Sequence, residues 1–353
     1  GGTNNIGTNT NGLSISSGST LSGTASILNG ETISGAGSVN ITEYHNSTSS
    51  DLDAITTNVS TITLSSSTTL DANARLPVPA DNSAVVITGN NTITLGGTSN
   101  IGSNTNGLSV SSGSTLVGTA AILNGENISG SGSVNVTNIS SSNVALNTII
   151  ATTITITLSD NITLDSSTRL PIPDSSGALI IAGGNDYILT LGSTTNLGSS
   201  LSVNASTNVT GTANILNGEI ISGSGSVNVT NYHSSTSSVL NTITTNGATI
   251  TLSSSTTLSS SARLPIPADN SAVIITGSNT LILGGSNNIG SNTNGLSISS
   301  GSTLQGTASI LNGETISGSG SVIVTNISTS TVGLNAITAS TVTISLPSSI
   351  TLS

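Results

Sequence analysis

Three arginines are the only arginine or lysine side chains of this 353-residue chain, and all three stand in the same setting. They recur at one equal spacing, and each is followed after a few residues by an aspartate. The arginine–aspartate sets are Arg75 and Asp81, Arg169 and Asp174, and Arg263 and Asp269. A guanidinium so close to a carboxylate predicts a local ion pair that holds a corner of the fold. A docking contact with an acidic neighbouring chain is the alternative.

Each arginine opens a short proline segment, of which Leu76–Pro79 is the first example. Two of these four residues lack a backbone N–H and cannot donate to a β-ladder. We therefore expect the segment at a corner or on an outward bulge rather than inside a central strand. A proline-rich ligand for another protein is the alternative.

One glutamate per repeat follows an Asn-Gly turn, at positions Glu31, Glu126, Glu219 and Glu314. Glycosidase chemistry needs two carboxyl groups about 5 to 9.5 Å apart. No second acid recurs at a matching offset. We therefore expect solvated glutamates, no catalytic residue and no enzymatic activity.

Two Tyr-His pairs occupy matching positions in the first and third repeats: Tyr44 with His45, and Tyr232 with His233. One residue is gained or lost around this segment between copies, as in surface loops that tolerate insertion. We expect loops whose tyrosine and histidine side chains are available for contacts with a partner.

Acidic residues gather around the first of these pairs, where Glu43, Asp51 and Asp53 flank His45. A weak cation site is conceivable there, but the matching positions near Tyr232 lack the acids. The chain has no cysteine, which excludes disulfides and thiolate metal sites. We expect no metal and no cofactor.

Asparagines followed by x-Ser or x-Thr are frequent, and four are singled out as candidate glycosylation sites: Asn40, Asn46, Asn135 and Asn228. Asn135 alternates with two valines, so its side chain is expected to face outward. These residues would carry glycans if the source organism glycosylates secreted proteins.

The composition narrows the function classes. Charged residues are 5% of the chain and the formal net charge is −11, whereas about 25% charged residues is typical of a soluble domain. Three scattered arginines make no footprint for nucleic acid. The longest apolar runs, such as residues 178–182, are far too short for a transmembrane helix.

Nearly four copies of one long unit make up the chain. The Ile-Leu-Asn-Gly-Glu motif returns at nearly constant spacing, which divides the chain into residues 1–95, 96–191, 192–283 and an incomplete 284–353. The first copy starts without a signal peptide, so we expect a piece of a longer chain or a processed chain. The Tyr-His positions alternate with Ile-Ser, which makes pairs of copies the larger unit.

Short apolar clusters alternate with Ser, Thr and Asn, as in Ile154–Leu158, which is the pattern of strands with one buried face. Each copy divides into five segments of roughly 19 residues, as expected for coils that stack on one another, and coils of about 18 to 22 residues fit nearly as well. We therefore predict an all-β fold, a single parallel β-helix (β-solenoid) over residues 1–353. Coils stacked at about 4.8 Å would give about 19 coils and a rod of about 90 Å.

The segments Gly89–Gly97 and Gly130–Val136 resemble the coils of large repetitive β-helical surface proteins, such as autotransporter passengers and filamentous-haemagglutinin-like adhesins. The resemblance covers the whole chain as a general sequence pattern, without a signature motif. It implies no catalytic residue. It implies a secreted or cell-surface protein that adheres or forms filaments.

The expected function is therefore that of a structural extracellular surface fibre or filament subunit that associates with itself, end to end or laterally. The alternative is an adhesin that binds a host receptor or a glycan through exposed loops. An ice-binding solenoid is disfavoured because the Thr-x-Thr pairs are scattered among Ser and Asn. A polysaccharide lyase or hydrolase is disfavoured because no cluster of basic and acidic residues is present.

Overall fold

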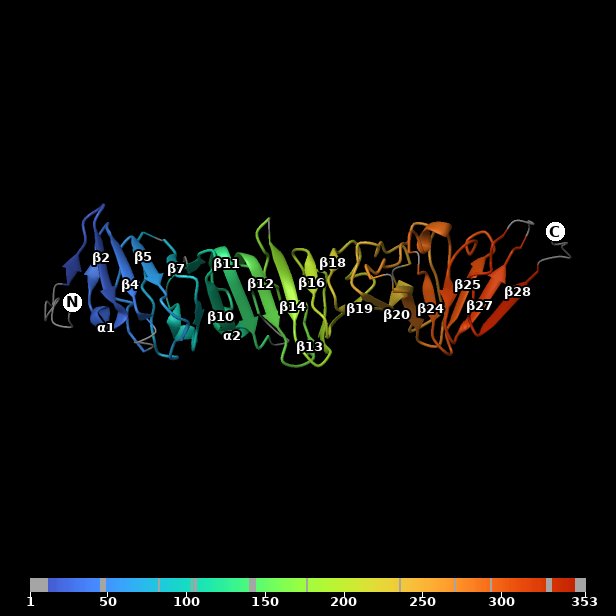
Figure 1. Cartoon of the computed structure of the whole chain (residues 1–353), viewed down its shortest axis with the longest axis horizontal. Coiled ribbons are helices and arrows are strands. Elements are labelled where there is room, and N and C mark those ends of the chain that lie inside the picture. Colours follow the sequence, from blue (N-terminus) through green and yellow to red (C-terminus); the bar gives the residue numbers. More distant parts are fainter. Residues whose placement is uncertain are drawn as a thin grey trace. The chain divides into compact units, whose positions relative to one another are not determined.

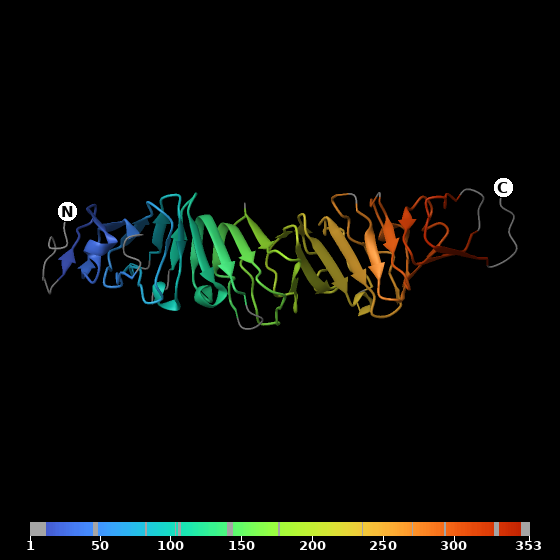
Figure 2. The same ribbon diagram turned by 60° about the horizontal axis from the view of Figure 1, so that its bottom comes forward.

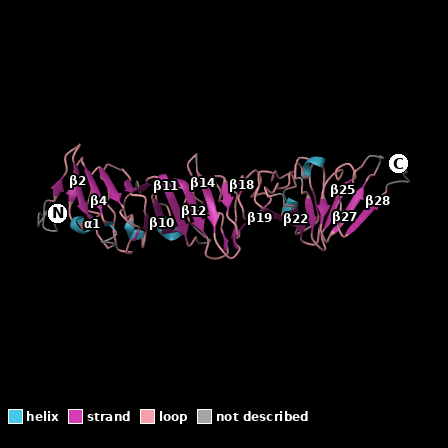
Figure 3. Cartoon of the chain, viewed as in Figure 1, coloured by secondary structure: helices cyan, strands magenta, loops and turns pink. Residues whose placement is uncertain are grey.

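Every strand pair that the structure describes is parallel, and successive strands stack on one another as coils of a solenoid. The computed structural model describes residues 12–44, 49–81, 83–102, 104, 107–139, 144–175, 177–234, 236–269, 271–292, 294–327 and 332–346. The fold is an all-β parallel β-solenoid of about 15 turns with 5% of its residues in helices. The predicted fold class is therefore confirmed, and strands joined by loops, with few helical turns, make up the ribbon (Figure 3).

The chain divides into two compact units. The first comprises Gly1–Ser159, Ser167–Ile180 and Leu197–Ser199, and the second comprises Asp160–Ser166, Ile181–Asn196 and Ser200–Ser353. Within each unit, strands that are distant in sequence lie side by side (Figures 1 and 2). The prediction of one continuous solenoid over residues 1–353 stays a prediction.

The strands of the first unit form one branched sheet and a separate pair. The order of neighbouring strands in the sheet is β2, β4, β5, β7, β9, β11 and β12. A branch joins it at β11, where β10 pairs with β11, β8 with β10, and β6 with β8. The separate pair is β1 with β3. Their bounds are β1 (Leu13–Ser14), β2 (Thr20–Thr24), β3 (Ile33–Ser34), β4 (Ser38–Thr42), β5 (Val59–Thr63), β6 (Thr68–Thr69), β7 (Val85–Thr88), β8 (Thr92–Thr94), β9 (Leu108–Val110), β10 (Thr115–Thr119), β11 (Ile128–Thr137) and β12 (Ile149–Thr157). The first three residues of β14 (Ala178–Ala182) also belong to this unit.

Most strands of the second unit form two rows. One row runs β13, β15, β17, β19, β20, β22, β24 and β26, and the other runs β21, β23, β25, β27 and β28, while β16 pairs with β18. Their bounds are β13 (Ile162–Thr163), β15 (Tyr187–Thr190), β16 (Leu201–Val203), β17 (Thr207–Thr212), β18 (Ile221–Ser222), β19 (Ser226–Thr230), β20 (Gly247–Thr251), β21 (Thr256–Thr257), β22 (Val273–Thr276), β23 (Thr280–Ile282), β24 (Leu296–Ile298), β25 (Thr303–Thr307), β26 (Ile316–Ser317), β27 (Ser321–Thr325) and β28 (Thr341–Ser345).

Helices are single turns at the corners. They are α1 (Ala25–Leu28), α2 (Ala120–Leu123) and the 3₁₀ helices η2 (Thr98–Asn100), η3 (Tyr232–Ser234) and η4 (Ser286–Asn288). Thr24 caps α1 by accepting a hydrogen bond from the N–H of Ile27 (3.3 Å). Among the described residues, no helix has the length and apolar character needed to cross a membrane.

Coils of unequal length replace the uniform coil expected from the sequence. Paired residues are offset by 18 between β2 and β4, 21 between β4 and β5, 25 between β5 and β7, and 23 between β7 and β9. The second unit repeats this series from β17 to β24. The prediction of about 19 coils is wrong, because loops at the corners absorb extra residues without disturbing the stacked strands.

The core consists of aliphatic side chains stacked from coil to coil. In the first unit Ile41, Ile62 and Ile87 face one another in register, and none has measurable exposure. On β4 the alternate residues Ser38, Asn40 and Thr42 face outward, and on β5 Thr61 and Thr63 do so. This arrangement follows from the two-residue period of a strand with one buried face.

Candidate functional site

The three arginines occupy one repeated backbone position, and the site is built around it. The backbone bridges are Asp51 with Arg75, Ala145 with Arg169, and Val239 with Arg263. At the first corner the N–H of Arg75 donates to the carbonyl of Ser50 (3.1 Å), and its own carbonyl accepts from Leu52 (3.0 Å). Each arginine is therefore held by the coil before it, whatever its side chain contacts.

The proline segments that follow the arginines lie inside the stack. Pro77 and Pro79 are buried, and between them the N–H of Val78 donates to the carbonyl of Ile55 one coil earlier (3.0 Å). Pro171, Pro173, Pro265 and Pro267 are buried as well. Of the two expected places, a corner or an outward bulge, the outward bulge is wrong, because the residue between the two prolines supplies the N–H that the ladder needs.

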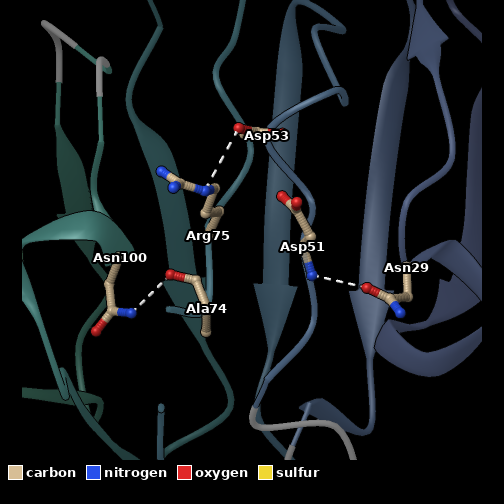
Figure 4. Close-up of polar contacts among 6 residues, drawn as sticks. All are labelled: Asn29, Asp51, Asp53, Ala74, Arg75 and Asn100. Carbon is tan, nitrogen blue, oxygen red and sulfur yellow. Dashed lines mark hydrogen bonds and ion pairs between the residues drawn. The ribbon is translucent and has the colours of Figure 1, made fainter. Parts of the chain in front are cut away.

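A buried asparagine supports the corner from the next coil. The Asn100 side chain has no exposed surface, and its Oδ1 accepts from the N–H groups of Gly96 (2.7 Å) and Gly97 (3.0 Å). Its Nδ2 donates to the carbonyls of Asp71 (2.8 Å) and Ala74 (2.7 Å), the last drawn in Figure 4. One amide therefore satisfies four backbone groups around the residue that precedes Arg75.

The same buried asparagine recurs in the second unit, although sequence reasoning missed it. Asn288 accepts from Gly284 and Gly285 and donates to Ser259 and Ala262, all within 2.8 to 3.0 Å. The signal in the sequence is an asparagine four residues after a glycine and two before another, repeated in each copy. In a chain so rich in asparagine this pattern resembles an ordinary turn.

The Asn-Gly turns act as clamps on the same corner. Oδ1 of Asn29 accepts from the N–H of Asp51 (2.7 Å), as Figure 4 shows. The N–H of Gly30 donates to the Asp51 carbonyl (2.8 Å). The other clamps join Asn124 to Ala145, Asn217 to Val239, and Asn312 to Gly333. In the first three copies the bridge partner of the arginine (Asp51, Ala145 or Val239) is thus held by the Asn-Gly turn on one side and by the arginine on the other.

The side chains of Arg75 and Arg263 have partners other than those predicted, whereas the pair of Arg169 with Asp174 stays a prediction. Nε of Arg75 lies 3.8 Å from Oδ2 of Asp53, one coil earlier, and this is the ion pair drawn in Figure 4. Nη1 of Arg263 donates to the carbonyls of Ser260 (3.1 Å) and Ala262 (2.9 Å). Nη1 of Arg169 donates to the carbonyl of Thr168 (3.1 Å).

The following aspartates serve the backbone or a hydroxyl. Oδ1 of Asp81 accepts from the N–H of Ser83 (3.1 Å), Oδ1 of Asp269 accepts from the N–H of Ser271 (3.0 Å), and Oδ2 of Asp174 accepts from Oγ1 of Thr152 (2.7 Å). The predicted pairs of Arg75 with Asp81 and of Arg263 with Asp269 are therefore wrong among the described residues. Each of these two aspartates closes its own turn two residues on, which fixes its carboxylate there.

Two carboxyl groups meet beside Arg75. Loss of hydration, then the hydrogen bond with Asp51 and its negative charge, raise the pKa of Asp53, while the charge of Arg75 acts in the opposite direction. The matching residues of the other copies are Ala145 and Asn147, Val239 and Asn241, and Gly333 and Asn335. The acidic pair thus belongs to the first copy alone.

Both tyrosines of the expected contact loops are buried. Tyr44 and Tyr232 have no exposed surface, and the hydroxyl of Tyr232 donates to the carbonyl of Ser238 (3.3 Å). Burial raises the pKa of both phenols, and the negative charge of Asp51 adds to this for Tyr44. The prediction that these rings contact a partner is wrong, because their apolar area is buried under the corner.

A sequence signal for this burial was present. The other copies carry Ile139 and Ile327 at the tyrosine positions, and both side chains are buried. An exchange between tyrosine and isoleucine indicates an inward position.

His233 is exposed, with Nδ1 3.0 Å from Oγ of Ser253. His45 lies outside the described residues, and its role as a contact stays a prediction, as does that of His233.

Three of the four candidate glycosylation sites lie within strands and face outward, as expected for Asn135. Their side-chain oxygens each accept from a threonine hydroxyl one coil on, in the pairs Asn40 with Thr63 (2.9 Å), Asn135 with Thr157 (2.8 Å) and Asn228 with Thr251 (2.9 Å). These amides are half-buried and form part of the stack. Asn46 lies outside the described residues, and glycosylation at all four stays a prediction.

The repeated glutamates are partly enclosed. Burial raises the pKa of Glu126, Glu219 and Glu314 above its ordinary value. Among the described residues, no three histidine, aspartate or glutamate side chains come together as metal ligands.

Comparison of the chain with protein-family models, curated proteins and solved structures finds no match.

Proposed function

We propose that this chain is a structural segment of an extracellular surface fibre or filament, without catalytic activity. The observation that supports this most is the recurrence of one polar framework in copy after copy. The Asn-Gly clamp appears four times, and the buried asparagine appears with the same four hydrogen bonds in both units. The amide side chains of these asparagines join one coil to the next and are therefore not available to a ligand.

Outward positions follow the same principle. Thr42, Thr137, Thr230 and Thr325 each donate from Oγ1 to a glycine carbonyl of the preceding coil, at 3.3 to 3.4 Å. Small hydroxyl side chains can repeat at every coil without the repulsion that stacked like charges would cause. Low charge is therefore a requirement of this architecture and supports a repetitive structural role.

Association with further coils of the same kind is part of the proposal. Strand β28 pairs with β27 along one edge, and all five of its residues are exposed. Val342 and Ile344 have 44% and 50% of their surface exposed. A strand edge with exposed aliphatic side chains is a template for another strand.

Sedimentation velocity of the chain over a hundredfold concentration range tests this proposal. We expect larger species to grow with concentration, and Ile344→Lys to suppress them because a charge on an edge strand opposes pairing. Ile274→Lys is the matched control, since Ile274 is 42% exposed on β22, which has strands on both sides. A monomer at every concentration, or equal effects of both variants, would contradict the proposal.

A further inference from the structure

A groove in the first unit adjoins the Asp53–Arg75 ion pair. Its volume is about 350 Å³, and its lining comes from three successive coils. Asp53 comes from the first of these, Arg75 and Val78 from the second, and Ser99 and Ile101 from the third. The volume lies at the lower end of the range for small-molecule sites, which corresponds to one or two sugar rings.

The other copies show that the fold does not require the charges at this groove. Asn147, Asn241 and Asn335 stand where the first copy has Asp53, and their corners keep the same backbone bridges or clamps. Asparagine has the shape of aspartate without its charge. The negative charge beside the groove is thus an addition to a corner that is complete without it.

Arg75 is also held differently from its counterpart in the second unit. Arg263 turns Nη1 back onto the carbonyls of Ser260 and Ala262, whereas Arg75 meets Asp53 through Nε. The side chains of Arg75 and Asp53 are 43% and 49% exposed. The outer N–H groups of the guanidinium and the carboxylate oxygens therefore remain within reach of a ligand in the groove.

We propose that this groove binds a neutral saccharide residue. Asp53 accepts hydrogen bonds from two neighbouring hydroxyls, Arg75 donates to a ring or hydroxyl oxygen, and the hydroxyl of Ser99 completes the polar side. Val78 is half-buried and supplies a small apolar surface for the C–H face of the sugar. Two carboxyl groups against one guanidinium leave an excess of negative charge, which disfavours uronic and sialic acids.

Saturation-transfer NMR with the methyl glycosides of a neutral hexose, an amino hexose and a hexuronic acid tests the proposal. We expect the neutral glycoside to bind with a millimolar dissociation constant, as is typical of a single small ligand on a shallow site. Asp53→Asn restores the residue of the other copies and should weaken binding about tenfold, because charge-assisted hydrogen bonds are lost.

Two further variants separate this site from general effects. Asp269→Asn removes a charge in the second unit, keeps an oxygen for the Ser271 N–H, and should leave binding unchanged. Arg75→Gln removes the donor and should weaken binding to a similar extent as Asp53→Asn. The proposal is overturned if no neutral glycoside binds, if only the amino or acidic sugar binds, or if Asp53→Asn binds as well as the unaltered chain.

Discussion

The corner around Arg75 and the corner around Arg263 share one backbone and differ in their charges. In both, the arginine bridges the preceding coil and a buried asparagine holds the residue before it. At the first corner the guanidinium pairs with Asp53, and at the other it returns to backbone carbonyls. The comparison separates what the solenoid needs from what a single copy has added.

The shared part consists of neutral amides, which explains why it can repeat. A buried asparagine satisfies two N–H groups and two carbonyls at once without the desolvation cost of a charge. The arginine lies at the surface, where the energetic difference between one partner and another is small. Charges at this position can therefore change between copies while the coil beneath them stays the same.

Removing the buried asparagine should produce the largest effect, and the same effect at both corners. Asn100→Ala and Asn288→Ala each remove the partner of four backbone groups, one in a buried hydrogen bond and three in half-buried ones. At about 1 kcal/mol or more for the buried group, and less for each of the three that water partly reaches, we expect a loss of about 3 kcal/mol in the free energy of unfolding. Urea denaturation followed by circular dichroism measures it.

The neighbouring Asn287→Ala is the control, since Asn287 is exposed on η4 and should change stability by less than about 0.5 kcal/mol. A small loss for Asn288→Ala, no greater than that of the control, would show that water replaces the amide. Unequal losses at the two corners would show that the framework is not shared.

The two buried tyrosines should respond differently to loss of the hydroxyl. Tyr232 donates to the Ser238 carbonyl, whereas the Tyr44 hydroxyl is buried without a hydrogen-bond partner among the described residues. We expect Tyr232→Phe to cost about 1 kcal/mol, and Tyr44→Phe to be neutral or slightly stabilising, because it removes a buried polar group that lacks a partner. The same denaturation experiment compares them, and equal losses would contradict this difference.

The stacked strands of both corners could be predicted from the sequence. Alternation of Ile or Val with Thr, Ser or Asn specifies one inward and one outward face, and repetition over the whole chain specifies stacking. Row after row, residues such as Ile41 and Ile62 meet in register for this reason. Local periodicity is sufficient here because each coil contacts only its neighbours.

The partner of Arg75 could not be predicted, because it depends on the length of a coil. Asp53 lies one coil before Arg75 in space, whereas coils of the uniform length expected from the sequence place other residues beside the arginine. Corner loops set the coil length, and their Gly, Asn and Ser residues resemble one another. The buried asparagines were hidden in the same way, since burial depends on which loops close over them.

Acidification should strengthen the first corner relative to the other. The pKa of Asp53 is raised in the folded state, so its contribution to stability is complete below the unfolded pKa of about 3.9 and is lost as the pH rises through the folded value. Hydrogen exchange at the Leu52 N–H, which donates to Arg75, should report slower opening at low pH after correction for intrinsic rates. The Leu240 N–H, which donates to Arg263, is the internal control. Asp53→Asn should abolish the difference between the two amides.

The smallest effect on stability is expected from the arginines themselves. Arg75→Gln breaks an ion pair whose partners are both more than 40% exposed, so the free energy of unfolding should fall by less than about 1 kcal/mol. The pKa of Asp53 should nevertheless rise further, because Arg75 is the charge that lowers it. A carboxyl-carbon NMR titration measures this shift, with Arg263→Gln as the control that leaves Asp53 unchanged. An unchanged Asp53 titration in Arg75→Gln would mean that the ion pair does not persist in solution, and the difference between the two corners would then reduce to the acidic pair alone.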